Sequence, residues 1–174
     1  MFEKNEKPGG MLTYGIPSYK LEKDVVEAEI DIIRTLGVEI KCGVEVGKDI
    51  TLDELRKDGY EAFYIAIGCQ GSRKSGVDGE DADGVMSAVD ILHEIAENHD
   101  LDLKGNKTVV IGGGNVAVDV ARSTKRCGAD VLGMFCLESR EEMPASEEEI
   151  FETEDEGIQI NNGWGVKEIL AENG

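Results

Sequence analysis

A run of glycines with a carboxylate downstream is the part of this sequence best suited to chemistry. The three glycines 112–114 come directly after the apolar run 109–111, and a helix-like stretch follows them. The spacing is Gly-x-Gly-x-x-Ala, completed by Ala117, and Glu138 follows about twenty residues later. This order of strand, glycine turn, helix, second strand and acidic residue is typical of a site for a dinucleotide.

Each position in the pattern has a physical role. Gly112 permits the tight turn out of the strand, Gly114 lets the backbone approach a pyrophosphate, and Ala117 lets the helix pack closely. The free N–H groups and the positive dipole end at the start of the helix favour phosphates. The residues expected to hold the nucleotide are Gly112, Gly113, Gly114, Asn115, Val116, Ala117, Glu138, Ser139 and Arg140.

The choice between the two nicotinamide dinucleotides depends on Glu138. A carboxylate there accepts hydrogen bonds from the adenosine ribose and repels a 2′-phosphate, so NAD(H) is favoured over NADP(H). Arg140 lies close enough in sequence to keep NADP(H) open. The alternative is a glycine-rich turn in an α/β domain that binds no nucleotide.

No catalytic side chain is identified, because hydride transfer is carried by cofactors and the protein sets their alignment. Asn115 either orders the glycine turn or touches the nicotinamide side. Met143 and Pro144 either shape the nicotinamide pocket or end a loop. The four cysteines lack CxxC spacing, so no metal site is expected.

Apolar periodicity predicts the elements that position these residues. Helices are expected over 23–36, from Thr51 to near Gly59, over 87–98 and over 146–156, and strands over 38–46, 61–67, 109–111, 134–138 and 158–160. The alternation predicts an α/β fold with Rossmann-like parallel sheets, helices on both faces and two partial dinucleotide-binding lobes. The loop-rich stretch 70–84 is the expected boundary.

Composition narrows the partners and the compartment. A net charge of −19 argues against a nucleic-acid partner and an anionic membrane surface. Reduced cysteines and a charged N-terminus that is unlike a signal peptide predict a cytoplasmic protein. The acidic run 141–156 is either a solvated helix face or a docking surface for a basic partner. His93 and His99 are expected at the surface.

Several stretches together resemble one family. They are 8–17, 77–81, 112–122 and 139–146, which run Pro-Gly-Gly-Met-Leu-x-Tyr-Gly-Ile-Pro, Val-x-Gly-Glu-Asp, Gly-Gly-Gly-Asn-Val-Ala-Val-Asp-Val-Ala-Arg and Ser-Arg-Glu-Glu-Met-Pro-Ala-Ser. In this order they are similar to the glutamate synthase small (beta) subunit and its relatives, which include the reductase part of dihydropyrimidine dehydrogenase. The resemblance covers nearly the whole chain.

The resemblance implies a flavin enzyme in which electrons pass from NAD(P)H to FAD and on to an iron–sulfur or large-subunit partner. Residues 1–76 would form part of an FAD-binding domain, and 77–174 part of an inserted NAD(P)-binding domain. On the flavin side, Glu3 would hold the FAD ribose, and Gly9, Gly10, Met11 and Leu12 would lie along the flavin.

The chain departs from the family pattern, and two of the departures bear directly on its function. The glycine loop for FAD should precede Phe2 and is absent from these residues, so this chain alone is expected to be inactive and to expose apolar surface that favours self-association. Many relatives carry an arginine pair after the second strand, where this chain has Cys136, Leu137 and Glu138, which agrees with the NAD(H) preference. The alternative is a non-catalytic dinucleotide-binding module, with an NAD sensor as one form of it.

Overall fold

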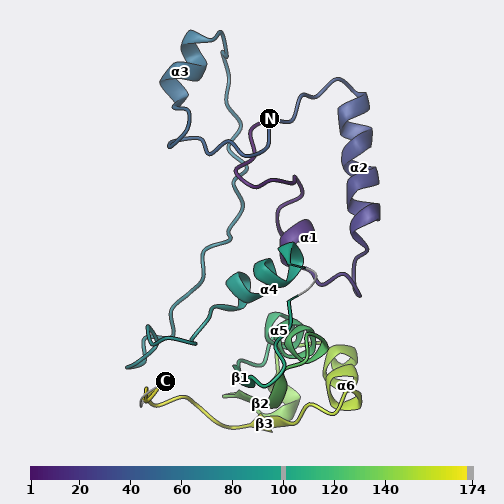
Figure 1. Ribbon diagram of the computed structural model, residues 1–174, viewed down its shortest axis with the longest axis vertical. Helices are drawn as coiled ribbons and strands as arrows, with labels where there is room; N and C mark the ends of the chain where they lie inside the picture. Colours follow the sequence, from purple (N-terminus) through teal and green to yellow (C-terminus); the bar gives the residue numbers. More distant parts are fainter. Residues whose placement is uncertain (99–100, 172–174) are drawn as a thin grey trace. The chain divides into compact units, whose positions relative to one another are not determined.

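The computed structural model describes residues 1–98 and 101–171 and divides into two units, 1–70 and 71–174 (Figure 1). His99 lies outside the described residues. His93 is partly exposed on its helix, 3.6 Å from a carboxylate oxygen of Glu97.

A parallel three-stranded sheet organises the second unit. Its strands are β1 (Lys107–Ile111), β2 (Asp130–Cys136) and β3 (Ile160–Asn162), in the order β1-β2-β3. The connections are helical: α5 (Asn115–Arg126) joins β1 to β2, and η1 (Arg140–Glu142) with α6 (Glu147–Asp155) joins β2 to β3. Helix α4 (Ala88–Glu97) precedes the sheet. The predicted α/β fold with a parallel sheet is confirmed.

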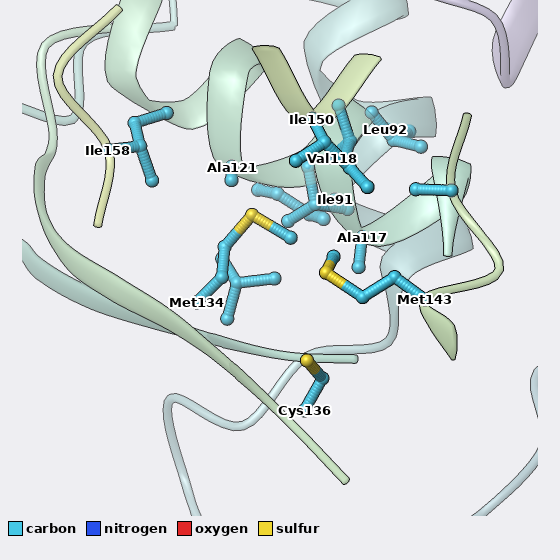
Figure 2. Close-up of a cluster of buried hydrophobic side chains, with 13 residues drawn as sticks. Ile91, Leu92, Ala117, Val118, Ala121, Met134, Cys136, Met143, Ile150 and Ile158 are labelled. Atoms are coloured by element: carbon cyan, nitrogen blue, oxygen red, sulfur yellow. The ribbon is translucent and has the colours of Figure 1, made fainter. Parts of the chain in front are cut away.

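The core of this unit lies between the sheet and α5. Helix α5 packs on β1 and β2, and α4 and α6 lie against α5. Met134 and Val118 are fully buried here, and each such side chain stabilises the fold by about 1.5–3 kcal/mol. Figure 2 shows the cluster, which includes Ile91, Leu92, Val110, Ala117, Val118, Ala121, Met134, Cys136, Met143, Ile150 and Ile158. On β1, Val109 and Ile111 alternate with the buried Val110 and are about half exposed.

The predicted helix starts are confirmed by their caps. Ser87 Oγ accepts a hydrogen bond from Asp90 N at the start of α4, and Ser146 Oγ accepts one from Glu149 N at the start of α6. These caps satisfy backbone N–H groups that the first helical turn leaves open. After α6, Gly157 takes a positive φ of 74°, as expected of a glycine that ends a helix.

The first unit is mostly helix and irregular chain. It contains α1 (Met11–Tyr14), α2 (Lys23–Thr35) and α3 (Leu52–Lys57). Val26, Ile30 and Ile33 have the spacing of one helical face, and α2 buries the first two, whereas Ile33 is 45% exposed. The predicted helix from Thr51 forms as α3, and Thr51 and Glu54 make a capping box at its start.

Two strand predictions in this unit are wrong. Residues 38–46 form only isolated bridges, Phe2 with Lys41 and Val46 with Ile50. Residues 61–67 pair with no strand among the described residues, and Tyr64 and Ile67 are 95% and 84% exposed. A β pattern describes a side-chain face that fits a sheet, and it produces a strand only where neighbouring strands supply hydrogen-bond partners.

Candidate dinucleotide site

The turn after β1 requires glycine at its first position. Gly112 has a φ of 135°, and its N–H donates to the carbonyl of Phe135 on β2 at 2.9 Å. A Cβ atom at residue 112 would stand 3.2 Å from Cβ of Ala117. The small residues at these two positions therefore let α5 begin close to the end of β1, which is the packing that the sequence pattern predicted.

Gly113 is the most crowded glycine of the three. A Cβ atom here would stand 3.0 Å from Cβ of Cys136 and 3.0 Å from Oε2 of Glu138. Sequence reasoning gave this position no role of its own. The run of three glycines, where the pattern needs only two, was the signal that a third close approach exists.

Gly114 faces open space. It is the N-cap of α5 with an extended backbone, φ −96° and ψ 171°, and no heavy atom of the described chain lies within 4 Å of a Cβ built there. No side chain of the described residues caps the start of α5. Open N–H groups, the helix dipole and a position without a side chain together form the arrangement that binds a phosphate group.

Glu138 lies beside this turn. Its carboxylate is next to Gly113, and its main-chain carbonyl accepts hydrogen bonds from Asn162 Nδ2 at 3.1 Å and Gly163 N at 3.2 Å. Asn162 Nδ2 also lies 3.3 Å from Sγ of Cys136. Sequence reasoning missed Asn162, because nothing in its own segment marks it as a partner of the β2 end.

The environment of Cys136 follows from the same contacts. Burial raises the pKa of this thiol, and the charge of Glu138 raises it further, against the opposing hydrogen bond from Asn162. The thiol therefore stays protonated at neutral pH and serves as a small apolar group under the glycine turn. Among the other three free cysteines, only Cys69 is exposed.

Asn115 connects the glycine turn to the loop before α6. Its Oδ1 accepts a hydrogen bond from Ser146 N at 3.0 Å, and Ala145 N donates to the carbonyl of Gly113 at 3.0 Å. Met143, in the same loop, is buried in the core cluster (Figure 2). Of the two readings of Asn115, its hydrogen bond supports the role of ordering the turn.

Other residues named from the sequence lie less directly at the turn. Val116 is exposed on the first turn of α5. Ser139 Oγ donates to Glu142 Oε2 at 3.2 Å, within its own loop. Arg140 Nη2 donates to Glu154 Oε2 on α6 at 2.9 Å, so its guanidinium is directed to that helix.

The acidic run is bound to α5 by arginines. Arg122, whose side chain is 6% exposed, pairs with Glu149, Glu152 and Glu156. Arg126 adds a second contact to Glu156 at 2.7 Å. Burial raises the pKa of Glu156, but hydrogen bonds from Arg126 and Arg122 outweigh it and hold the pKa below its usual value. Three carboxylates of the run therefore form ion pairs within the chain, which sequence reasoning did not foresee.

The residues named for the flavin side all lie in the first unit. The carboxylate of Glu3 accepts a hydrogen bond from Asn5 N at 2.9 Å. Gly9 and Gly10 have φ values of 111° and 53° and lead into α1. Met11 and Leu12, on α1, are partly exposed. Gly9, Gly10, Met11 and Leu12 therefore lie in one turn at the start of α1, and Glu3 precedes this turn in the sequence.

The described part of the chain has neither a metal-binding cluster nor a helix that could span a membrane. It contains no group of three or more His, Cys, Asp or Glu side chains arranged to hold a metal ion. None of its helices has both the length and the apolar character needed to cross a membrane.

Comparison with known proteins places the chain among redox enzymes. A family model described as pyridine nucleotide-disulphide oxidoreductase matches residues 5–174. The chain is 40% identical to the NADP(+)-dependent formate dehydrogenase subunit beta of Moorella thermoacetica, covering 100% of this chain and 25% of that protein. It is 34% identical to the glutamate synthase (NADPH) small chain of Escherichia coli strain K12, covering 92% of this chain and 36% of that one. The second match confirms the resemblance seen in the sequence.

Solved structures share the fold at lower identity. FprA from Mycobacterium tuberculosis, in complex with NADPH, matches with a TM-score of 0.68 at 24% identity over 89% of this chain and 40% of its own. A 2-naphthoyl-CoA reductase complex matches with a TM-score of 0.72 at 19% identity, over 97% of this chain and 25% of its own. The chain therefore spans only a quarter to two fifths of the length of these proteins.

Proposed function

Because this chain belongs to the pyridine nucleotide-disulphide oxidoreductase family, we propose that the glycine turn 112–114 binds the pyrophosphate of a nicotinamide dinucleotide. The observation that carries the proposal is Gly114, which opens to free space at the uncapped start of α5. No part of the chain fills the space beside this glycine, so a phosphate group of a ligand can approach its backbone there.

The nucleotide we propose is NADH. The Glu138 carboxylate lies against the same turn and suits the two hydroxyls of a ribose, while it repels a 2′-phosphate. The named relatives point the other way, since their names specify NADP(H). Arg140 is the residue of this loop whose charge suits a 2′-phosphate, and the titration below therefore includes both nucleotides.

For the whole protein we propose electron transfer from the dinucleotide to FAD and onward to a partner subunit. Bound nicotinamide and flavin would supply the hydride-transfer chemistry. The residues of the chain would bind and orient the dinucleotide. The glycine turn and α5 would bind the pyrophosphate, and Glu138 would bind the ribose. Loop 143–146 holds the turn in place through its hydrogen bonds to Gly113 and Asn115. On the flavin side, the exposed Met11 and Leu12 beside Gly9 and Gly10 offer an apolar surface that fits a flat ring.

The names of the relatives support the partner subunit in this proposal. Their names describe a subunit beta and a small chain. An NAD sensor would need a docking surface for its partner, and the acidic run 141–156 is the segment that could supply one. Carboxylates of that run instead form ion pairs with Arg122 and Arg126 of α5.

The test is a calorimetric titration of the 174-residue chain with NADH and NADPH. Gly114→Ala adds one methyl group at an allowed backbone conformation and in open space, so the fold remains. Nucleotide affinity is expected to fall by about tenfold or more, because the methyl group overpacks the phosphate contact. Gly71→Ala is the matched control, since a Cβ there also meets nothing within 4 Å and no positive φ is required.

The proposal fails if the folded chain binds neither nucleotide. It also fails if Gly114→Ala and Gly71→Ala bind as tightly as the parent chain. Circular dichroism of each variant separates loss of binding from loss of fold.

A further inference from the structure

Arg140 is tied to the acidic helix rather than to the glycine turn. It follows Glu138 by two residues on the loop after β2, and its Nη2 lies 2.9 Å from Oε2 of Glu154. The two side chains are 42% and 47% exposed, so solvent and a ligand can reach both. The Arg140 guanidinium therefore already forms an ion pair with the Glu154 carboxylate.

The helix that presents Glu154 is held in place from its other side. Glu152 and Glu156, which flank Glu154 in sequence, both pair with the buried Arg122 of α5. Arg126 also holds Glu156. An ion pair between two loose surface chains is easily lost, but here the partner of Arg140 is fixed on a helix anchored to the cofactor-binding helix.

We propose that Glu154 is a specificity-determining residue for the dinucleotide, acting by withholding Arg140 from a 2′-phosphate. This inference rests on the proposed nucleotide site. A guanidinium is the group best suited to a phosphate dianion, and it must leave Glu154 to reach one. NADH carries no 2′-phosphate and makes no such demand on Arg140. The pair therefore disfavours NADPH specifically, in addition to the repulsion from Glu138.

The experiment measures the affinities of NADH and NADPH for the full chain and three variants by calorimetry. Glu154→Gln removes the carboxylate charge and keeps the side-chain size. The NADPH affinity is expected to rise by about two- to fivefold, the size of one exposed ion pair, while that of NADH stays unchanged. Asp155→Asn is the control: it removes the same charge from the next residue of α6, which forms no ion pair with any residue that the structure describes.

The double variant Arg140→Ala/Glu154→Gln identifies the route. The gain in NADPH affinity is expected to vanish there, because the cation released by Glu154→Gln is gone. An equal gain in Asp155→Asn, an unchanged NADPH to NADH ratio in Glu154→Gln, or a gain that survives in the double variant would each overturn the inference. If one of these results appears while the parent chain binds NADH, only the inference on Glu154 fails and the proposed nucleotide site remains. If the folded parent chain binds neither nucleotide, both the inference and the proposed site are wrong.

Discussion

The carboxylate of Glu138 lies against the backbone of Gly113, where a Cβ atom would stand 3.0 Å from Glu138 Oε2. The acidic residue after β2 and the turn after β1 are therefore neighbours in space, although 25 positions separate 113 from 138 in the numbering. The parallel pairing of Ile111 with Phe135 brings the ends of the two strands together. Any ligand seated on the turn would meet this carboxylate.

Replacing Gly113 is expected to damage the fold, whereas replacing Gly114 is not. In Gly113→Ala the new methyl group would be crowded by Cβ of Cys136 and Oε2 of Glu138, each 3.0 Å away. Overpacking of this kind costs about 1–3 kcal/mol of unfolding free energy. Urea denaturation of the two variants checks the difference. Equal midpoints for Gly113→Ala and the parent chain would show that the turn has more room than the structure gives it.

Loss of Arg122 is expected to loosen α6 from α5. In Arg122→Ala three carboxylates lose a buried partner. We expect a loss of about 2–4 kcal/mol, slightly below the value for a fully buried pair because the carboxylates can turn to water. Urea denaturation measures it, with Arg56→Ala as the control. Arg56 forms an exposed pair with Asp53 at 2.7 Å and lies 5.3 Å from the centre of the Phe63 ring, so its removal should cost only about 1 kcal/mol.

The same cluster predicts a loss of stability in acid. The pKa of Glu156 is lower in the folded chain than its ordinary value of 4.5, so the ionised form favours folding. Its contribution is complete above the unfolded-state pKa and is lost as the pH falls through the folded-state pKa. Urea midpoints between about pH 6 and about pH 3 measure this, and Glu156→Gln should flatten part of the decline. An identical pH profile in that variant would count against the assignment.

Asn115 is expected to contribute to stability through Ser146. Asn115→Ala removes the acceptor of the Ser146 N–H, and the expected cost is about 0.5–1.5 kcal/mol. Asn115→Asp keeps an acceptor oxygen at this position and should retain most of the stability. Thermal unfolding of both variants distinguishes the two readings of this residue. If the alanine variant melts like the parent chain, the side chain does not order the turn.

The exposed apolar segment 61–67 predicts self-association of this chain. Tyr64 and Ile67 are almost fully exposed, and neighbouring side chains in the segment are also apolar. Exposed apolar surface of this kind favours association. Light scattering should show a mass that rises with concentration, and Tyr64→Lys/Ile67→Lys should reduce the rise. A concentration-independent monomer would contradict the prediction.

The sequence predicts helix caps correctly where the hydrogen-bond partners lie in the next turn of the same helix. The caps at Ser87 and Ser146 need only groups within the next turn, and both are present. Ser146 and Glu149 have the spacing of a capping box, but only half of it forms. The second donor, Ser146 N, goes to Asn115, while the Glu149 carboxylate pairs with Arg122. Contacts between distant elements replaced a local one that the spacing permitted.

The sequence by itself determined the strand–turn–helix unit, its parallel sheet and the glycine pattern, because helix periodicity, caps and small-residue turns are properties of neighbouring positions. Only the tertiary structure decided which groups meet: Glu138 with Gly113, Asn162 with the main chain of Glu138, and Arg140 with Glu154. It also decided against a strand over 61–67, because a strand exists only where hydrogen-bonded neighbours lie beside it. Side-chain pairing across elements depends on strand register and helix packing, which no local pattern specifies.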